Sequence, residues 1–122
     1  MKDKLLYLFD ILDSIEKITQ YTNGWNYNEF ESDDKTQDAV IRQITIIGEA
    51  ASKLDKEIKT QISDIPWHKV VAMRNRMVHD YAGIILEVVW QTIYEDLAPL
   101  KVAIDTFLKS QKDDEQNSIE ES

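Results

Sequence analysis

The chain has 122 residues, enough for one domain with its own core, and it contains no cysteine, which excludes a disulfide framework and a cysteine-type zinc site. Its 23 acidic and 14 basic residues give a net charge of −9, which argues against broad, non-specific binding to DNA or RNA. No apolar run reaches the roughly 18 residues of a membrane span, and the first residues do not form a signal peptide, so we expect a cytoplasmic protein without membrane contact.

Glycine and proline are rare, with three and two residues, which favours long helices over a sheet of many strands. Residues 2–21 carry apolar side chains at helical spacing, and so does a second stretch that starts with a capping residue within 32–34 and ends near Leu54. The second stretch is apolar on more than one side, which predicts either the centre of a bundle or a bundle that also dimerises. Gly48 in its middle costs up to about 1 kcal/mol relative to alanine, and close approach of another helix is a reasonable use for it.

A short helix or turn is expected over residues 55–62. A third main helix runs from Trp67 to about His79, with Ser63 or Asp64 as its capping residue.

The fourth main helix is expected over residues 86–109, after a break at Gly83. Pro99 removes a hydrogen bond inside this segment and predicts a kink or a restart near Ala98. These elements together predict an all-α fold, an antiparallel four-helix bundle with an additional short helix.

The end of the chain differs in composition from the rest. Residues 110–122 hold one basic and five acidic residues, a net charge of −4, which leaves −5 for residues 1–109. A polar, charged segment of this kind cannot bury much apolar surface, so we expect a disordered acidic tail after a helical domain over residues 1–109.

A positive stretch over residues 67–81 stands out in this acidic chain. It holds three basic residues and both histidines of the chain, namely His68, Lys69, Arg74, Arg76 and His79. On a helical projection Arg74 falls about 40° from Val70, inside the apolar arc, whereas Arg76 falls at about 240° on the polar side. A charged group at a helix contact needs a partner. Arg74 is therefore either paired with a carboxylate or helix terminus, or placed to meet an anion such as phosphate.

His79 lies five residues after Arg74, which rotates it by about 140° in an ideal helix. The helix must therefore unwind near His79, or a second copy must face the first across a two-fold axis with both residue types in a shared cleft. The alternative for His79 is a histidine stabilised by the dipole at the helix end. Tyr81 returns to the side of Arg74, where the alternative is a packed ring with an exposed hydroxyl.

Arginine and histidine without gathered carboxylates suit one reaction in particular. Metal-dependent cleavage of a phosphodiester needs clustered acids to hold cations, and this stretch has none. Metal-free cleavage of RNA uses the adjacent 2′-hydroxyl as nucleophile, while histidine transfers protons and arginine stabilises charge on the phosphoryl group.

The segment from Arg74 to Tyr81 matches the R-x4-H-x-Y motif of the HepT-type HEPN toxins. The surroundings are similar as well, above all Gly48-Glu49-Ala50 and Pro66-Trp67, so that the resemblance covers about residues 1–109. It implies a HEPN-like bundle that forms a homodimer with the motif at the interface. It also implies a metal-independent endoribonuclease toxin of a type VII toxin–antitoxin system, with neither metal nor cofactor.

The resemblance assigns roles to individual residues. Arg74 and His79 correspond to the catalytic pair, and Asn75 to the supporting polar residue after the arginine. Tyr81 corresponds to the tyrosine that a cognate MntA-type nucleotidyltransferase antitoxin modifies with AMP. The expected partners are an RNA substrate and this antitoxin, in a homodimer or a larger hetero-oligomer, and not DNA. Lys69 and Arg76 of the positive stretch are candidate RNA contacts.

Two other functions remain open from the sequence. One is a non-catalytic HEPN module that docks a nucleotidyltransferase or binds nucleotide without cutting RNA. The other is a purely structural helical dimer, for which replacing Arg74 by methionine would be neutral or stabilising.

Overall fold

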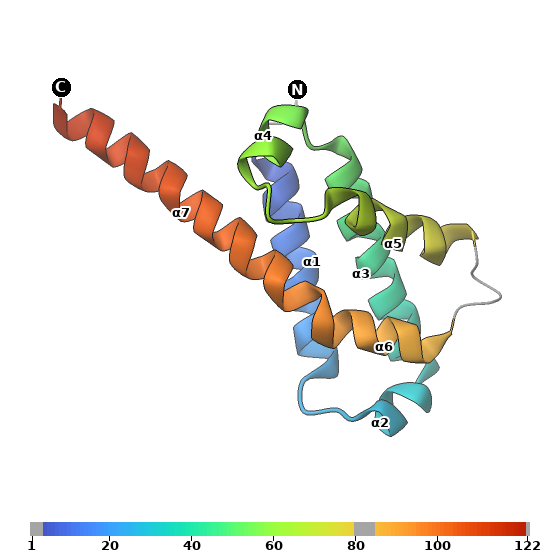
Figure 1. Cartoon of the computed structure of the whole chain (residues 1–122). Helices are drawn as coiled ribbons and strands as arrows, with labels where there is room; N and C mark the ends of the chain where they lie inside the picture. Colours follow the sequence, from blue (N-terminus) through green and yellow to red (C-terminus); the bar gives the residue numbers. More distant parts are fainter. Residues whose placement is uncertain (1–3, 80–84, 122) are drawn as a thin grey trace.

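The computed structural model describes residues 4–79 and 85–121 and, within these ranges, all side chains except those of residues 78–79 and 115–121. The described residues are helical without any strand, which confirms the all-α class (Figure 1). None of their helices is both long and apolar enough to cross a membrane. The helices are α1 (Leu6–Thr22), α2 (Tyr27–Glu31), α3 (Asp34–Lys53), α4 (Lys56–Gln61), α5 (Trp67–His79), α6 (Leu86–Glu95) and α7 (Leu97–Glu121).

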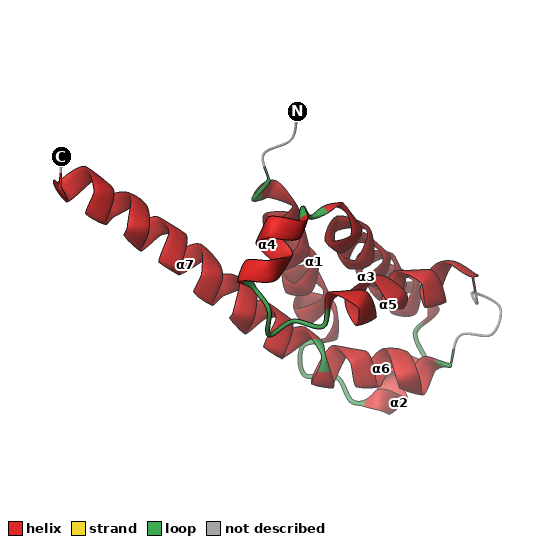
Figure 2. Ribbon diagram, turned by 45° about the horizontal axis from the view of Figure 1, so that its top comes forward, coloured by secondary structure: helices red, strands yellow, loops and turns green. Residues whose placement is uncertain are grey.

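Helix α3 is the centre of the bundle, because it packs against both α1 and α5 (Figure 2). Its apolar residues Val40, Ile44 and Ile47 are fully buried, and Ala50 is buried too. The prediction that more than one side of this helix is covered is therefore confirmed. Helices α1 and α3 run in opposite directions, so the antiparallel arrangement is visible in this pair (Figure 1).

The structure contains a second short helix, α2, that the sequence analysis did not predict. Asn26 caps it reciprocally: its side chain accepts a hydrogen bond from the Glu29 amide at 2.9 Å, and the Glu29 carboxylate accepts from the Asn26 amide at 3.2 Å. Phe30 is fully buried and packs against Trp90 of α6, with ring centroids 5.1 Å apart. Five residues are too few to show a helical period, so only the capping pair signals this element.

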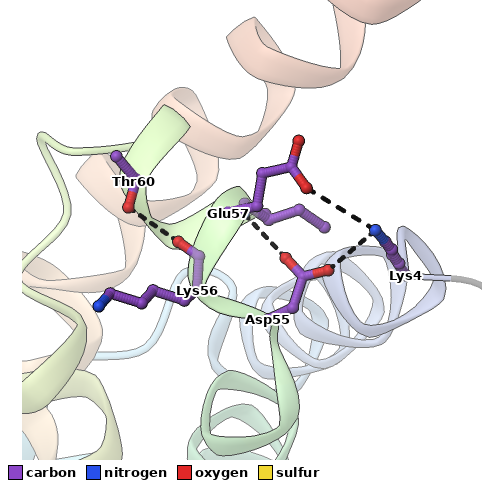
Figure 3. A network of polar contacts seen from close by, with 6 residues as sticks. Lys4, Asp55, Lys56, Glu57 and Thr60 are labelled. Atoms are coloured by element: carbon purple, nitrogen blue, oxygen red, sulfur yellow. Dashed lines mark hydrogen bonds and ion pairs between the residues drawn. The ribbon is translucent and has the colours of Figure 1, made fainter.

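The predicted short helix after Leu54 is confirmed as α4, and Asp55 begins it. The Asp55 carboxylate accepts a hydrogen bond from the Ile58 amide at 2.9 Å and lies 3.4 Å from the Lys4 ammonium (Figure 3). Asp33 caps α3 in the same way, accepting from the Thr36 amide at 2.9 Å. Among the three capping candidates of the second main helix, the structure therefore uses Asp33.

The expected fourth helix is two helices, α6 and α7, separated at Asp96. Pro99 falls in the first turn of α7, where the missing amide hydrogen costs no intrahelical hydrogen bond. The predicted restart is thus confirmed and begins at Leu97, next to the expected Ala98. Leu97, Leu100 and Ile104 of α7 are buried in the core.

The disordered tail predicted for residues 110–122 is wrong for most of its length, because α7 continues without a break to Glu121. Its carboxyl-terminal part extends away from the bundle (Figures 1 and 2). The segment contains no glycine or proline, and lysine, glutamine and glutamate are good helix formers. The helix propensity of these residues therefore favours a continuous helix. The composition of the segment predicted disorder because it has few apolar residues.

Candidate active site

The positive stretch lies on α5, whose start is fixed by two local contacts. The indole nitrogen of Trp67 donates to the carbonyl of Ile62 at 3.1 Å, and the carbonyl of Pro66 accepts from the amides of Lys69 and Val70 at 2.9 and 3.3 Å. Pro66 therefore holds the position before the first helical residue, in place of the predicted Ser63 or Asp64. The predicted bounds of the helix, Trp67 and His79, agree with the structure.

Arg74 is half-buried and faces α3, as its helical phase predicted. Its Cβ atom lies over Gly48, where an added Cβ would meet the backbone nitrogen and Cα of Arg74 at 3.1 Å. The expected use of Gly48 for a close helix approach is confirmed, and the residue that approaches is Arg74 itself.

The guanidinium of Arg74 has few partners in the part of the chain that the structure describes. Its Nη1 donates to Asn75 Oδ1 at 2.9 Å, and its Nε is buried without a hydrogen-bond acceptor. The ion pairs among the described residues involve Lys4, Lys17 and Lys101. Pairing of Arg74 with a carboxylate, the structural alternative, is therefore not found there, and the partner found for its guanidinium is the neighbouring Asn75.

His79 is the last residue of α5, and its side chain lies outside the described residues, as does the whole of Tyr81. The backbone nevertheless answers one question, because α5 stays α-helical from Arg74 through His79. The helix therefore does not unwind between these two residues, and α5 ends at His79 itself. In an ideal helix the positions of residues 74 and 79 lie about 140° apart around the axis.

Lys69 and Arg76 are exposed and lie on another flank of α5. They line a groove of about 1110 Å³ between α5, α7 and the segment before α5. Asp96 lines it too: burial and neighbouring Glu95 raise the pKa of its carboxyl, while Lys69 and Arg76 act to lower it. Residues 67–79, which contain no acid in sequence, therefore have a carboxylate near them in space, and the two candidate RNA contacts are separated from Arg74.

Gln43 on α3 is a further residue of interest that the sequence analysis missed. It is 7% exposed, and its Oε1 accepts no hydrogen bond from the described residues. A glutamine within an otherwise apolar stripe was the available signal. Nowhere among the described residues do three histidine, aspartate or glutamate side chains gather as a metal site would require.

The fold and the site define a class of protein: an all-α bundle in which a histidine shares one helix with an arginine that has no carboxylate partner among the described residues. Residues 11–107 match the family model described as "Ribonuclease HepT-like". The chain therefore belongs to the HepT-like ribonuclease family.

Named relatives cover most of the chain. It is 40% identical over 95 residues to "Probable ribonuclease HepT" of Thermococcus cleftensis, which spans 78% of this chain and 86% of that protein. It is 32% identical over 118 residues to "Putative RNase MJ0127" of Methanocaldococcus jannaschii, which spans 97% of this chain and 98% of that protein. No solved structure matches the chain.

Proposed function

We propose that this protein is the toxin of a type VII toxin–antitoxin pair and cleaves RNA without a metal ion, using Arg74 and His79. The observation that carries the proposal is the state of Arg74, a half-buried cation with no carboxylate partner among the described residues. Burying a charge without a counter-ion is costly, so an arginine kept in this state is suited to meeting an anion that arrives from solution. The RNA phosphate is that anion, and membership of a ribonuclease family supports the choice.

The reaction is an internal transfer at phosphorus. The 2′-oxygen forms a bond to the adjacent phosphorus, the bond from phosphorus to the 5′-oxygen breaks, and the products are a 2′,3′-cyclic phosphate and a 5′-hydroxyl. His79 takes part in moving the proton from the 2′-hydroxyl or to the leaving 5′-oxygen. Arg74 stabilises the extra negative charge on the phosphoryl oxygens.

The active form in this proposal is a homodimer. Because α5 stays helical through His79, we expect positions 74 and 79 about 140° apart around its axis. A two-fold axis beside α5 would bring the arginine of one copy and the histidine of the other to the same cleft. It would also supply two histidines, enough for one general base and one general acid.

The cognate antitoxin in this proposal is a nucleotidyltransferase that transfers AMP from ATP to Tyr81, alone or within a larger hetero-oligomer. Tyr81 is two residues after His79, so an added AMP would bring a negative charge next to the catalytic residue and repel the RNA phosphate. Lys69 and Arg76 would contact RNA outside the catalytic centre. Their contribution is reduced by the nearby carboxylate of Asp96.

The decisive experiment compares Arg74→Ala and His79→Ala with the unchanged protein. Each substitution should reduce RNA cleavage by about two to four orders of magnitude, because each removes a transition-state interaction. The measurement is cleavage of a labelled RNA in EDTA, with analysis for 2′,3′-cyclic phosphate ends. Arg42→Ala, which removes an exposed arginine of α3, is the matched control and should leave the rate unchanged.

Normal cleavage by both variants would refute the assignment of the catalytic pair. Loss of all cleavage in EDTA, with recovery on adding Mg²⁺, would refute the metal-free route. An unchanged protein that leaves RNA intact in a sensitive assay, yet co-purifies with a nucleotidyltransferase, would favour the non-catalytic binding module.

A further inference from the structure

The contact between Gly48 and Arg74 has no room for a side chain on α3. An added Cβ at position 48 would collide with the Cβ of Arg74 and lie 3.1 Å from its backbone nitrogen and Cα. These atoms belong to the helix itself and cannot rotate away, unlike the far end of a flexible side chain. Any residue larger than glycine at position 48 must therefore push α5 away from α3.

The same contact fixes the position of the Arg74 Cβ, from which the rest of the side chain extends. The Cβ lies against α3, the Nε is buried without an acceptor among the described residues, and Nη1 is held by Asn75 at 2.9 Å. A buried donor without an acceptor is unfavourable. Packing of the two helices therefore places the start of this side chain, and the hydrogen bond to Asn75 holds one end of its guanidinium.

An arginine fixed in this way loses little conformational freedom when it meets a phosphate. We propose that Gly48 is a positioning residue for Arg74: its missing side chain lets α5 lie against α3 at the depth that presents the guanidinium to the RNA phosphate. The consequence for activity rests on the proposed function. The consequence for the placement of Arg74 does not.

The test uses Gly48→Ala in the full chain. Alanine favours a helix more than glycine does, so any loss of stability or activity comes from the contact with α5 and not from α3 alone. We expect kcat for RNA cleavage to fall by about 10- to 100-fold with little change in KM, because a small displacement of a catalytic group affects the transition state most. The matched control is Ile11→Val, which perturbs the buried core in α1 and should leave kcat unchanged.

A second measurement does not depend on activity. The Nε–H of Arg74 should give a side-chain signal in a ¹H–¹⁵N spectrum that exchanges slowly with solvent, because this atom is buried. The signal is identified by its loss in Arg74→Ala. In Gly48→Ala we expect it to shift and to exchange faster, whereas Ile11→Val should leave it in place. An unaltered signal together with unaltered kcat in Gly48→Ala would overturn the proposal.

A double-mutant cycle covers the case in which Gly48→Ala does not fold. Arg74→Gly removes the Cβ on the other side of the contact, so it should relieve a large part of the destabilisation caused by Gly48→Ala. If Gly48→Ala lowers the free energy of unfolding by the same amount with and without Arg74→Gly, position 48 needs glycine for another reason and the proposal fails. If Arg74→Ala cleaves RNA normally, the proposed function fails, while the spectrum and the cycle still decide whether Gly48 positions Arg74.

Discussion

At the scale of single residues, Arg74 shows what the position of a residue around a helix predicts and what it leaves open. Its position inside the apolar arc of α5 predicted that it faces a helix contact, and the structure confirms this. The phase could not say which residue it meets, because Gly48 lies 26 positions earlier in the chain. The absence of a carboxylate partner within the described residues is likewise a property of the packing.

Tyr81→Phe is the prediction for the proposed modification. When the protein is expressed with its cognate nucleotidyltransferase and ATP, its intact mass should increase by one or more AMP groups. The Phe variant should keep the unmodified mass, because it has no hydroxyl to accept the phosphoryl group, and should continue to cleave RNA. Tyr94→Phe, which removes the hydroxyl of an exposed tyrosine on α6, is the control and should be modified like the unchanged protein. Mass increments that persist on the same peptide in the Phe variant would rule out Tyr81 as the acceptor.

At the scale of helices, capping residues set the bounds as strongly as apolar periodicity does. Asp33 and Asp55 accept backbone hydrogen bonds at the starts of α3 and α4, and Asn26 does the same for α2. The long helices were predictable because their apolar stripes repeat over several turns. The short α2 was not, because its capping pair is its main signal and it is stabilised by packing of Phe30 on Trp90.

Asp55 gives α4 a stability that depends on pH. The hydrogen bond from the Ile58 amide, helped by Lys4, lowers the pKa of this carboxyl below its usual value of 3.8. A carboxyl whose pKa is lower in the folded state stabilises the fold above its unfolded pKa, and this contribution is lost as the pH falls through the folded pKa. Asp55→Asn, which keeps an acceptor but removes the charge, should therefore lower the melting temperature at pH 7.

At a pH below the folded pKa of Asp55 the same substitution should have little effect, since the carboxyl of the unchanged protein is then protonated as well. Thermal unfolding followed by circular dichroism at the two pH values measures the difference. Asp13→Asn removes an exposed carboxylate whose partner is Lys17 on the same helix, and serves as the control. A melting temperature that falls equally at both pH values would show that the charge of Asp55 is not the cause.

At the scale of the whole molecule, the net charge of −9 is unevenly distributed. The part of α7 that extends from the bundle carries much of it, with five acidic residues and one basic residue within 110–122. The positive stretch lies on α5, yet Asp96 from the junction of α6 and α7 lines the same groove as Lys69 and Arg76. The net negative charge of the whole chain therefore argues against non-specific RNA binding over its surface, but it does not exclude a local RNA-binding site.

Removal of residues 111–122 tests the role of this extension. The bundle should keep its melting temperature, because residues 112–114 of the extension are exposed and the part beyond projects away from the core. The net charge of the chain becomes less negative, changing from −9 to −5. Binding of an RNA oligonucleotide by the Arg74→Ala variant should therefore tighten by about two- to tenfold at low salt. The gain should shrink at high salt, where such long-range repulsion is screened.

A full-length variant with the five acids of this segment changed to glutamine or asparagine separates charge from helix length. It should bind RNA as the shortened chain does. An RNA affinity that depends on neither change would show that the extension does not act on RNA through its charge.

The sequence by itself determined the fold class, the main helices and the residues that carry the family motif. These are local properties: apolar residues repeat at the helical period, caps mark helix starts, and R-x4-H-x-Y is a run of neighbours. Only the tertiary structure decided that Arg74 meets Gly48, that Asp96 approaches Lys69 and Arg76, and that Gln43 is buried without a partner for its Oε1 among the described residues. The reason is physical, since these contacts join residues far apart in the chain, and their distances follow from how whole helices pack.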